Sequence, residues 1–221
     1  MNKINTPSVT AISTHAIFFS VEAVPQQDIL RKQKRICALG QYCLQSNHFI
    51  DVVPANNNLT LYLKDPNQLN NWLVDLVKIW DDIENVQLDS QHHQIITHYG
   101  GEHGPDLEAV ANYHKLTPEQ VIKRHTEATY HVLFLGFQPG FAYLHGLALT
   151  LHTPRRNEPR VRIPKGSVAI GGSQTGIYPS ISPGGWHIIG HTDFALFDIN
   201  NPSPCAIKPG DTLEFIAKDA Y

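Results

Sequence analysis

The sequence predicts an α+β domain followed by a mainly-β domain. Before residue 88 the pattern is strand, helix, strand, strand, helix, and its clearest element is an amphipathic helix at residues 69–80. From residue 129 onward, short β-branched and aromatic runs alternate with Gly and Pro clusters, which is typical of a barrel or sandwich. A polar stretch separates the two patterns, so we predict domains at residues 1–88 and 89–221.

The first domain is expected to be ferredoxin-like, because two helices alternating with four strands in this order are what that fold requires. Pro25 suits the first turn of the first helix. The apolar face of that helix consists of Ile29, Ile36, Leu39 and Cys43. Strands are expected at residues 16–21, 49–53, 59–63 and 93–97, and the last of these either completes this sheet or begins the second domain.

The second domain is expected to open with two short helices before its strands. Residues 104–108 begin the first, with an acidic side chain near its positive end. Thr117 and Gln120 form a capping box around Pro118, so a second helix should run to about residue 126. Strands are expected at residues 132–135, 168–170, 186–189 and 195–197.

Composition excludes several classes of function. A formal net charge of −3 and a pI near 6.5 provide no basic field for nucleic acid. The first ten residues contain no apolar signal region and no apolar run could span a bilayer, so we expect a cytoplasmic protein with no membrane contact. Three cysteines without a CxxC pair argue against a disulfide framework or a zinc knuckle and suit a reducing compartment.

An arginine-rich segment at residues 155–165 is the first candidate binding feature. It holds five positive side chains against one carboxylate, Glu158. Arginine forks suit carboxylates and phosphates, and Pro159 and Pro164, with Pro154 just before them, stiffen this segment. We therefore expect Arg155 and Arg162 to bind a small anionic substrate. The alternative is a solvated loop whose arginines pair with acidic residues of the same chain or of a partner.

Polar and aromatic residues near Gly-rich turns form the second candidate feature. Residues 137–141 read as a type II turn with Pro139 and Gly140 in its centre. An amide beside aromatic side chains makes a plausible wall for a small polar ligand, and nearby glycines let a ligand approach the backbone. The expected substrate-binding residues here are Gln138, Phe141, Tyr143, Gln174 and Tyr178. The alternatives are plain core for Phe141 and tight β-turns for the glycines.

Titratable residues cluster in and around the turn at residues 100–106. His98, Glu102 and Asp106 are the candidate general acids and bases, with His103 beside them. For Asp106, helix capping is the alternative role. Although the chain has thirteen histidines, it lacks HExxH spacing and cysteine ligand pairs, so we expect no metal site.

Motifs of a self-sufficient hydrolase or ATPase are missing from the sequence. It contains neither a GxxxxGK[ST] loop nor a GxSxG elbow, and its thiols lack a diagnostic histidine pattern. If the protein belongs to an enzyme, we therefore expect another chain to complete its site and the isolated chain to be inactive.

The blocks at residues 99–107, 124–126 and 133–198 resemble subunit 1 of the carboxyltransferase-domain family, which includes the B subunit of 5-oxoprolinase and allophanate hydrolase subunit 1. The resemblance implies a cyclophilin-like barrel in the second domain. It also implies an ATP-dependent opening of 5-oxo-L-proline to L-glutamate, with ADP and phosphate as the other products. The partners implied are a homologous carboxyltransferase subunit 2, which is the C subunit of 5-oxoprolinase, and a third protein, the A subunit. ATP would bind with the partner subunit.

The same resemblance leaves two alternatives open. Related fused forms are carboxyltransferase parts of urea carboxylases, which use carboxybiotin, and the chain could be subunit 1 of such a urea- or allophanate-type enzyme. No biotin is expected on this chain, because its only methionine is Met1 and it therefore lacks an MKM attachment motif. Other relatives resemble inhibitors of a sensor histidine kinase, so a non-catalytic regulator is the second alternative. Co-purification with a larger homologous subunit, or with a kinase, distinguishes the two classes.

Overall fold

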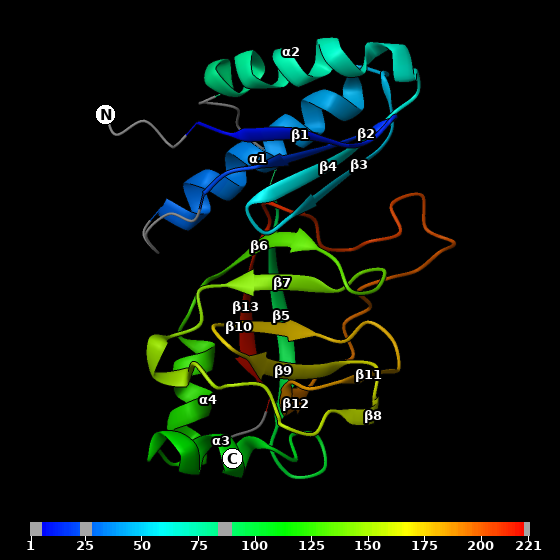
Figure 1. The fold of residues 1–221 in the computed structure, drawn as a ribbon. Helices are drawn as coiled ribbons and strands as arrows, with labels where there is room; N and C mark the ends of the chain where they lie inside the picture. The colour runs from blue at the N-terminus through cyan, green and yellow to red at the C-terminus, as the bar shows by residue number, and fades with distance from the viewer. Residues whose placement is uncertain (1–5, 23–27, 84–89, 219–221) are drawn as a thin grey trace. The chain divides into compact units, whose positions relative to one another are not determined.

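The computed structural model describes residues 6–22, 28–83 and 90–218. The chain divides into two compact units, residues 1–89 and residues 90–221. Figure 1 shows a helix-covered sheet in the first unit and a barrel in the second.

The first unit is built on a four-stranded antiparallel sheet of order β1-β2-β4-β3. Its elements are β1 (Ser8–Ser13), β2 (Ala16–Ser20), α1 (Ile29–Gln45), β3 (Phe49–Ala55), β4 (Asn58–Leu63), a 3₁₀ turn (Pro66–Gln68) and α2 (Leu69–Asp82). In the two central strands, Ile17 lies opposite Leu61 and Phe19 opposite Leu59. All four side chains are fully buried and share one core with both helices, because alternate residues of a strand point to the same face.

Both predicted helices of this unit are confirmed. Helix α2 buries Trp72, Leu76 and Trp80, three members of the predicted apolar stripe, and the Trp80 ring packs 5.2 Å from that of Phe19. Helix α1 buries its predicted residues Ile36, Leu39 and Cys43, whereas Ile29 is half-buried. The expected helix position of Pro25 lies outside the described residues.

The expected ferredoxin-like arrangement is not confirmed. The sheet edge beside β2 is occupied by β1, which comes before the other strands in the sequence. Sequence reasoning missed β1 because its six residues are mostly exposed and carry no alternating apolar pattern. The strand after α2, β5 (His92–Tyr99), belongs to the second unit, which answers the question of whether it closes the first sheet.

The predicted barrel is confirmed as a closed barrel of seven strands, in the order β10-β7-β6-β13-β5-β12-β9. Besides β5, its strands are β6 (Tyr130–Leu135), β7 (Ala142–His145), β9 (Ser167–Gly171), β10 (Gln174–Ile177), β12 (His187–His191) and β13 (Thr212–Ala217). Strands β5 and β13 run parallel, and the pairing of β9 with β10 closes the ring. Strands β8 (Arg160–Ile163) and β11 (Ser182–Gly184) form a separate two-stranded sheet. The cyclophilin-like assignment of this barrel stays a prediction.

One strand prediction in this unit is wrong. Residues 195–197 form no strand, and only Phe197 makes an isolated bridge, to Cys205. Leu196 is nevertheless buried in the barrel core, so the apolar run reflects burial of a loop and not strand pairing.

The two helices predicted before the barrel strands are α3 (Leu107–His114) and α4 (Pro118–Thr126). Thr117 Oγ1 accepts from Gln120 N, and Gln120 Oε1 accepts from Thr117 N, which completes the predicted capping box. Asp106 is the N-cap of α3, but its side chain makes no capping hydrogen bond. Among the described residues, no helix is long and apolar enough to cross a membrane.

The barrel core contains a fully buried histidine, His125. Thr175 Oγ1 donates to Ala169 O at 3.0 Å, so it accepts from His125 Nε2–H at 2.9 Å. The Nδ1 atom then accepts from the Tyr99 hydroxyl at 2.7 Å. Both ring nitrogens are thus satisfied by a neutral imidazole. Burial lowers the pKa of His125 to about 3, consistent with this neutral state.

The two thiols of the first unit, Cys37 and Cys43, are buried and unreactive at neutral pH. Burial raises the pKa of Cys37 to about 11, although a hydrogen bond with Gln33 acts in the opposite direction. Burial also raises the pKa of Cys43 to about 12. Because the thiolate is the nucleophilic form, neither residue is set up for nucleophilic catalysis at neutral pH.

Candidate functional site

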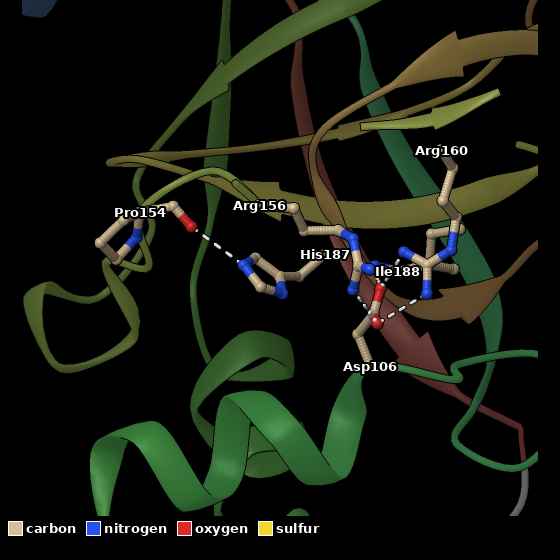
Figure 2. A network of polar contacts seen from close by, with 6 residues as sticks. All are labelled: Asp106, Pro154, Arg156, Arg160, His187 and Ile188. Carbon is tan, nitrogen blue, oxygen red and sulfur yellow. Dashed lines mark hydrogen bonds and ion pairs between the residues drawn. The ribbon is translucent and has the colours of Figure 1, made fainter. Parts of the chain in front are cut away.

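Asp106 is the centre of a buried polar network (Figure 2). Arg160 donates to both of its carboxylate oxygens, at 2.7 and 2.8 Å, which is the bidentate geometry of a guanidinium fork. Arg156 donates to Oδ1 at 3.0 Å, and the backbone N–H of Ile188 donates to Oδ2 at 2.7 Å. The carboxylate therefore joins the start of α3 to β8, to β12 and to the loop that carries Arg156.

This environment keeps Asp106 ionised. Burial by itself would raise its pKa, but the hydrogen bonds from Arg160 and Ile188 and the charges of Arg160 and Arg156 outweigh it, and the pKa is lowered. A carboxylate that already accepts from four donors is a weak proton acceptor. The geometry thus favours an anchoring role for Asp106 over the predicted acid–base role.

The arginine-rich segment splits into paired and exposed members. Arg156 and Arg160 pair with Asp106, as the alternative interpretation expected of some of these charges. Arg162 is exposed, and the exposed Arg155 guanidinium lies 5.9 Å from the Trp186 ring centroid, within cation–π range. Arg155, Arg162 and the exposed Lys165 are therefore the members of the segment that are open to an outside anion, and the two arginines are the predicted ones.

Four of the aromatic residues near the arginine-rich segment form a cluster, the aromatic cluster, consisting of Phe141, Tyr143, Tyr178 and Trp186. The rings of the other three lie 5.0 to 5.6 Å from that of Phe141. This cluster packs around Ala169, while the adjacent Val168 and Ile170 belong to the barrel core. Since alternate strand residues face opposite sides, the aromatic cluster covers the outer face of the barrel wall.

Gly171 in β9 and Gly176 in β10 lie directly against rings of the aromatic cluster. A Cβ atom at Gly171 would lie 2.5 Å from the Trp186 ring, and one at Gly176 would lie 3.0 Å from the Phe141 ring. The alternative role of the glycines as turn residues therefore does not describe these two, which make room for aromatic packing. Phe141 is buried, as its core alternative expected.

The turn that carries Gln138 has the predicted geometry. Phe141 N donates to Gln138 O at 3.0 Å, and Gly140 adopts φ +82°, as a type II turn requires. Gln138 Oε1 accepts from Ser180 Oγ at 2.8 Å, and its Nε2 is buried without a partner among the described residues. Gln174 is half-buried at the start of β10, opposite Gly171.

The preceding residue, Phe137, is held in a strained backbone conformation. Its φ is 69°, and Gln138 N donates to Gly136 O at 2.8 Å across it, which defines a γ-turn. The side chain is 59% exposed, and its ring lies 5.4 Å from that of Phe141. The strained turn thus presents an exposed ring at the edge of the aromatic cluster.

His98 has surroundings that differ from those of Asp106. It lines a cavity of about 260 Å³ on the second unit. The other lining residues are Gln94, Ile96, Thr192, Asp193, Phe194 and Lys218. The His98 ring lies 5.2 Å from that of His103, which lies 5.6 Å from that of His191. Glu102 is 90% exposed and reaches no closer than 3.9 Å to His103. The predicted catalytic residues therefore occupy three different environments: a buried ion pair, a cavity wall and the solvent-exposed surface.

A metal centre finds no support in this arrangement. Within residues 6–22, 28–83 and 90–218, no group of three or more His, Cys, Asp or Glu side chains is placed to hold a metal ion. The rings of His98, His103 and His191 pack against one another in that order.

The family is decided by a match over most of the chain. The model of the carboxyltransferase domain, subdomain C and D, matches residues 7–207. The chain belongs to this carboxyltransferase-domain family. The resemblance drawn from the sequence blocks is confirmed.

Two relatives of this carboxyltransferase-domain chain share one name. A protein from Escherichia coli O157:H7, named as the B subunit of 5-oxoprolinase, is 44% identical over 188 residues, covering 85% of this chain and 86% of that protein. A protein of the same name from Haemophilus influenzae is 40% identical over 211 residues, covering 96% of this chain and 98% of that protein. The crystal structure of TTHA0988 superimposes with a TM-score of 0.77 at 32% identity, over 94% of this chain and 40% of that longer chain.

Sequence reasoning misses several residues that the structure places beside the predicted ones. It allows the arginines of the segment to pair with acidic residues of the same chain but does not identify Asp106 as the partner of Arg156 and Arg160, and it does not consider Gln94, Asp193 and Lys218. The bidentate pair of Asp106 with Arg160 joins residues 54 positions apart, and no local pattern reveals such a contact. The alternation of Gln94, Ile96 and His98 along β5 is the one available signal, since it places the three on one face.

Proposed function

We propose that this chain is the B subunit of a 5-oxoprolinase, a hydrolase complex that opens 5-oxo-L-proline to L-glutamate while ATP is hydrolysed to ADP and phosphate. The observation that carries the proposal is the 40% identity with the B subunit of a 5-oxoprolinase over 96% of this chain and 98% of that protein. Similarity along the entire length favours a shared role as one subunit, beyond a shared domain.

The chain contributes binding surfaces, and partner subunits complete the catalytic site. We infer that the partners are a homologous carboxyltransferase subunit 2 (the C subunit) and a third protein (the A subunit), and that ATP binds with them. Three features support this division: the sequence contains no GxxxxGK[ST] loop or GxSxG elbow, burial raises the pKa of the Cys37 and Cys43 thiols, and Asp106 is saturated with donors.

The isolated chain is expected to release no ADP when supplied with 5-oxo-L-proline and ATP, whereas the complex with the A and C subunits releases ADP only when 5-oxo-L-proline is present. Purified proteins are mixed in equal amounts, and ADP is followed by a coupled assay. Turnover by the isolated chain at the rate of the complex would refute the inactivity of the subunit. A complex that releases no ADP on addition of 5-oxo-L-proline would refute the proposed function.

Arg155 and Arg162 are proposed to bind an anion, either the carboxylate of the substrate or a phosphate group. A charge-assisted contact contributes about 1.5–3 kcal/mol, so Arg155→Ala or Arg162→Ala is expected to lower kcat/KM of the complex roughly ten- to hundredfold, with little change in Tm. The exposed Lys34 of the first unit provides the control, Lys34→Ala.

The arginine variants also identify the anion. Loss of a contact to the carboxylate raises the KM for 5-oxo-L-proline, whereas loss of a contact to phosphate raises the KM for ATP. If both arginine variants melt early while their folded fraction keeps full activity, the arginines are structural and the anion contact is wrong.

A further inference from the structure

The cavity beside His98 is a candidate ligand site that the family match does not assign. We propose that it binds the lactam substrate, 5-oxo-L-proline, an inference that rests on the proposed function. A volume of about 260 Å³ suits a small ring compound, and the cavity combines apolar walls with a few polar groups, as small-molecule sites do.

The cavity is built on two neighbouring parallel strands and one loop. Along β5, Ile95 and Thr97 are buried in the barrel, so Gln94, Ile96 and His98 lie on its outer face. The parallel register pairs Ala217 with Thr97, and Lys218 N donates to Thr97 O at 3.0 Å. The register therefore places Lys218, which follows β13, beside His98.

The third wall comes from the loop that follows β12. Thr192 N donates to Gly166 O at 2.9 Å, and Phe194 N donates to Thr192 Oγ1 at 3.2 Å. Thr192 is buried, and the Phe194 ring lies 6.1 Å from that of His93. These contacts fix the loop, so Asp193 and Phe194 are held at the cavity by a defined backbone.

The polar groups of the cavity match those of 5-oxo-L-proline one by one. The ligand has one carboxylate, one lactam N–H, one lactam carbonyl and a ring of apolar methylenes. The Lys218 ammonium suits the carboxylate, which leaves a phosphate group as the anion for Arg155 and Arg162. The exposed Asp193 carboxylate suits the N–H. The Gln94 amide nitrogen donates to Glu214 Oε1 at 2.8 Å and has a second N–H that suits the lactam oxygen, and the His98 ring lies on the same face of β5. Ile96 and Phe194 provide apolar surface for the ring.

The His98 ring is the first of three histidine rings that pack in a row, and this packing restricts its orientation. His103 lies against His98, and His191 lies against His103. His191 Nε2 is 3.1 Å from Lys165 O, to which it donates. The far end of this stack is thus fixed to the backbone. A ring held in this way does not have to be ordered when the ligand binds.

Kinetics of the reconstituted complex test the assignment. Lys218→Met and Asp193→Asn are expected to raise the KM for 5-oxo-L-proline ten- to hundredfold, the range for a lost charge-assisted contact, and to leave the KM for ATP within twofold. The control is Lys208→Met, which removes an exposed lysine outside the cavity and should change neither constant. Tm values of the variants show whether either substitution destabilises the fold. Lys218 and Asp193 lie in separate segments, so a folding defect in one variant leaves the other variant as a valid test.

Binding to the full chain without its partners provides a second readout. The imidazole resonances of His98, assigned by His98→Gln, are expected to shift when 5-oxo-L-proline is added to the wild-type chain and to shift less with Lys218→Met. An active wild-type complex with unchanged KM in both cavity variants would overturn this inference and leave the proposed function standing. A wild-type complex without 5-oxo-L-proline-dependent ADP release would overturn both.

Discussion

Replacing Asp106 by alanine is expected to lower the free energy of unfolding by about 3–5 kcal/mol, because removal of one partner leaves the other charges of a buried ion pair uncompensated. The Asp106 side chain is only 5% exposed, and the side chains of Arg156 and Arg160 are 31% and 26% exposed. The substitution also leaves the Ile188 N–H without its acceptor. Urea unfolding of the full chain at neutral pH measures the effect.

The matched control is Glu102→Ala, which removes a 90% exposed carboxylate from the same turn region. Exposed ion pairs contribute about 0–1 kcal/mol, so this control should leave the unfolding midpoint nearly unchanged. The pKa of Asp106 is lowered in the folded state. Its stabilising contribution is therefore present above the pKa of the unfolded chain and is lost as the pH falls through the lower folded pKa. An Asp106→Ala protein as stable as wild type would contradict the anchoring role.

Acidification is expected to destabilise the second unit through His125. The unfolded imidazole gains a proton below its usual pKa of 6.5, whereas the folded one stays neutral until about 3. Since the unfolded state binds more protons between these values, stability falls as the pH decreases through this window. At 1.36 kcal/mol per pKa unit, the contribution of His125 should be roughly 3 kcal/mol less favourable at pH 4 than at pH 8.

The measurement is urea unfolding at pH 8 and pH 4 for wild type and for His125→Gln. The variant is less stable at pH 8, because it alters the contacts with Tyr99 and Thr175, but it should lose less stability than wild type on acidification. Replacement of the exposed His15, as His15→Gln, is the control and should retain the wild-type loss. Equal losses for wild type and His125→Gln would show that His125 is not the acid-sensitive group.

Features set by neighbours in the sequence could be predicted. The apolar spacing of α2, the capping box at Thr117 and the turn at Pro139 and Gly140 all depend on contacts within about one helical turn or one β-turn, and all three are present. Repeated short apolar runs between glycines and prolines predicted a barrel or a sandwich, and the family resemblance implied the barrel. The resemblance to the carboxyltransferase-domain family then supplied the function that these local patterns do not contain.

Features set by distant pairing could not be predicted. Strand β1 has too few buried residues to show a pattern, and it is joined to the sheet by its pairing with β2. The partners of Asp106 depend on how β8 and β12 meet the start of α3. Lys218 reaches the His98 cavity only through the parallel register of β13 with β5, which joins residues about 120 positions apart along the chain. Such contacts arise from topology and leave no local trace.

The central claim, that this chain belongs to a 5-oxoprolinase complex, is tested most directly by the coupling of the two half-reactions. Glutamate and ADP are quantified in the same reaction of the complex of this chain with the A and C subunits. Equal amounts of the two products, formed only when 5-oxo-L-proline and all three proteins are present, are the predicted result. ADP formation that is independent of 5-oxo-L-proline, or glutamate formation that continues when this chain is left out, would contradict the account.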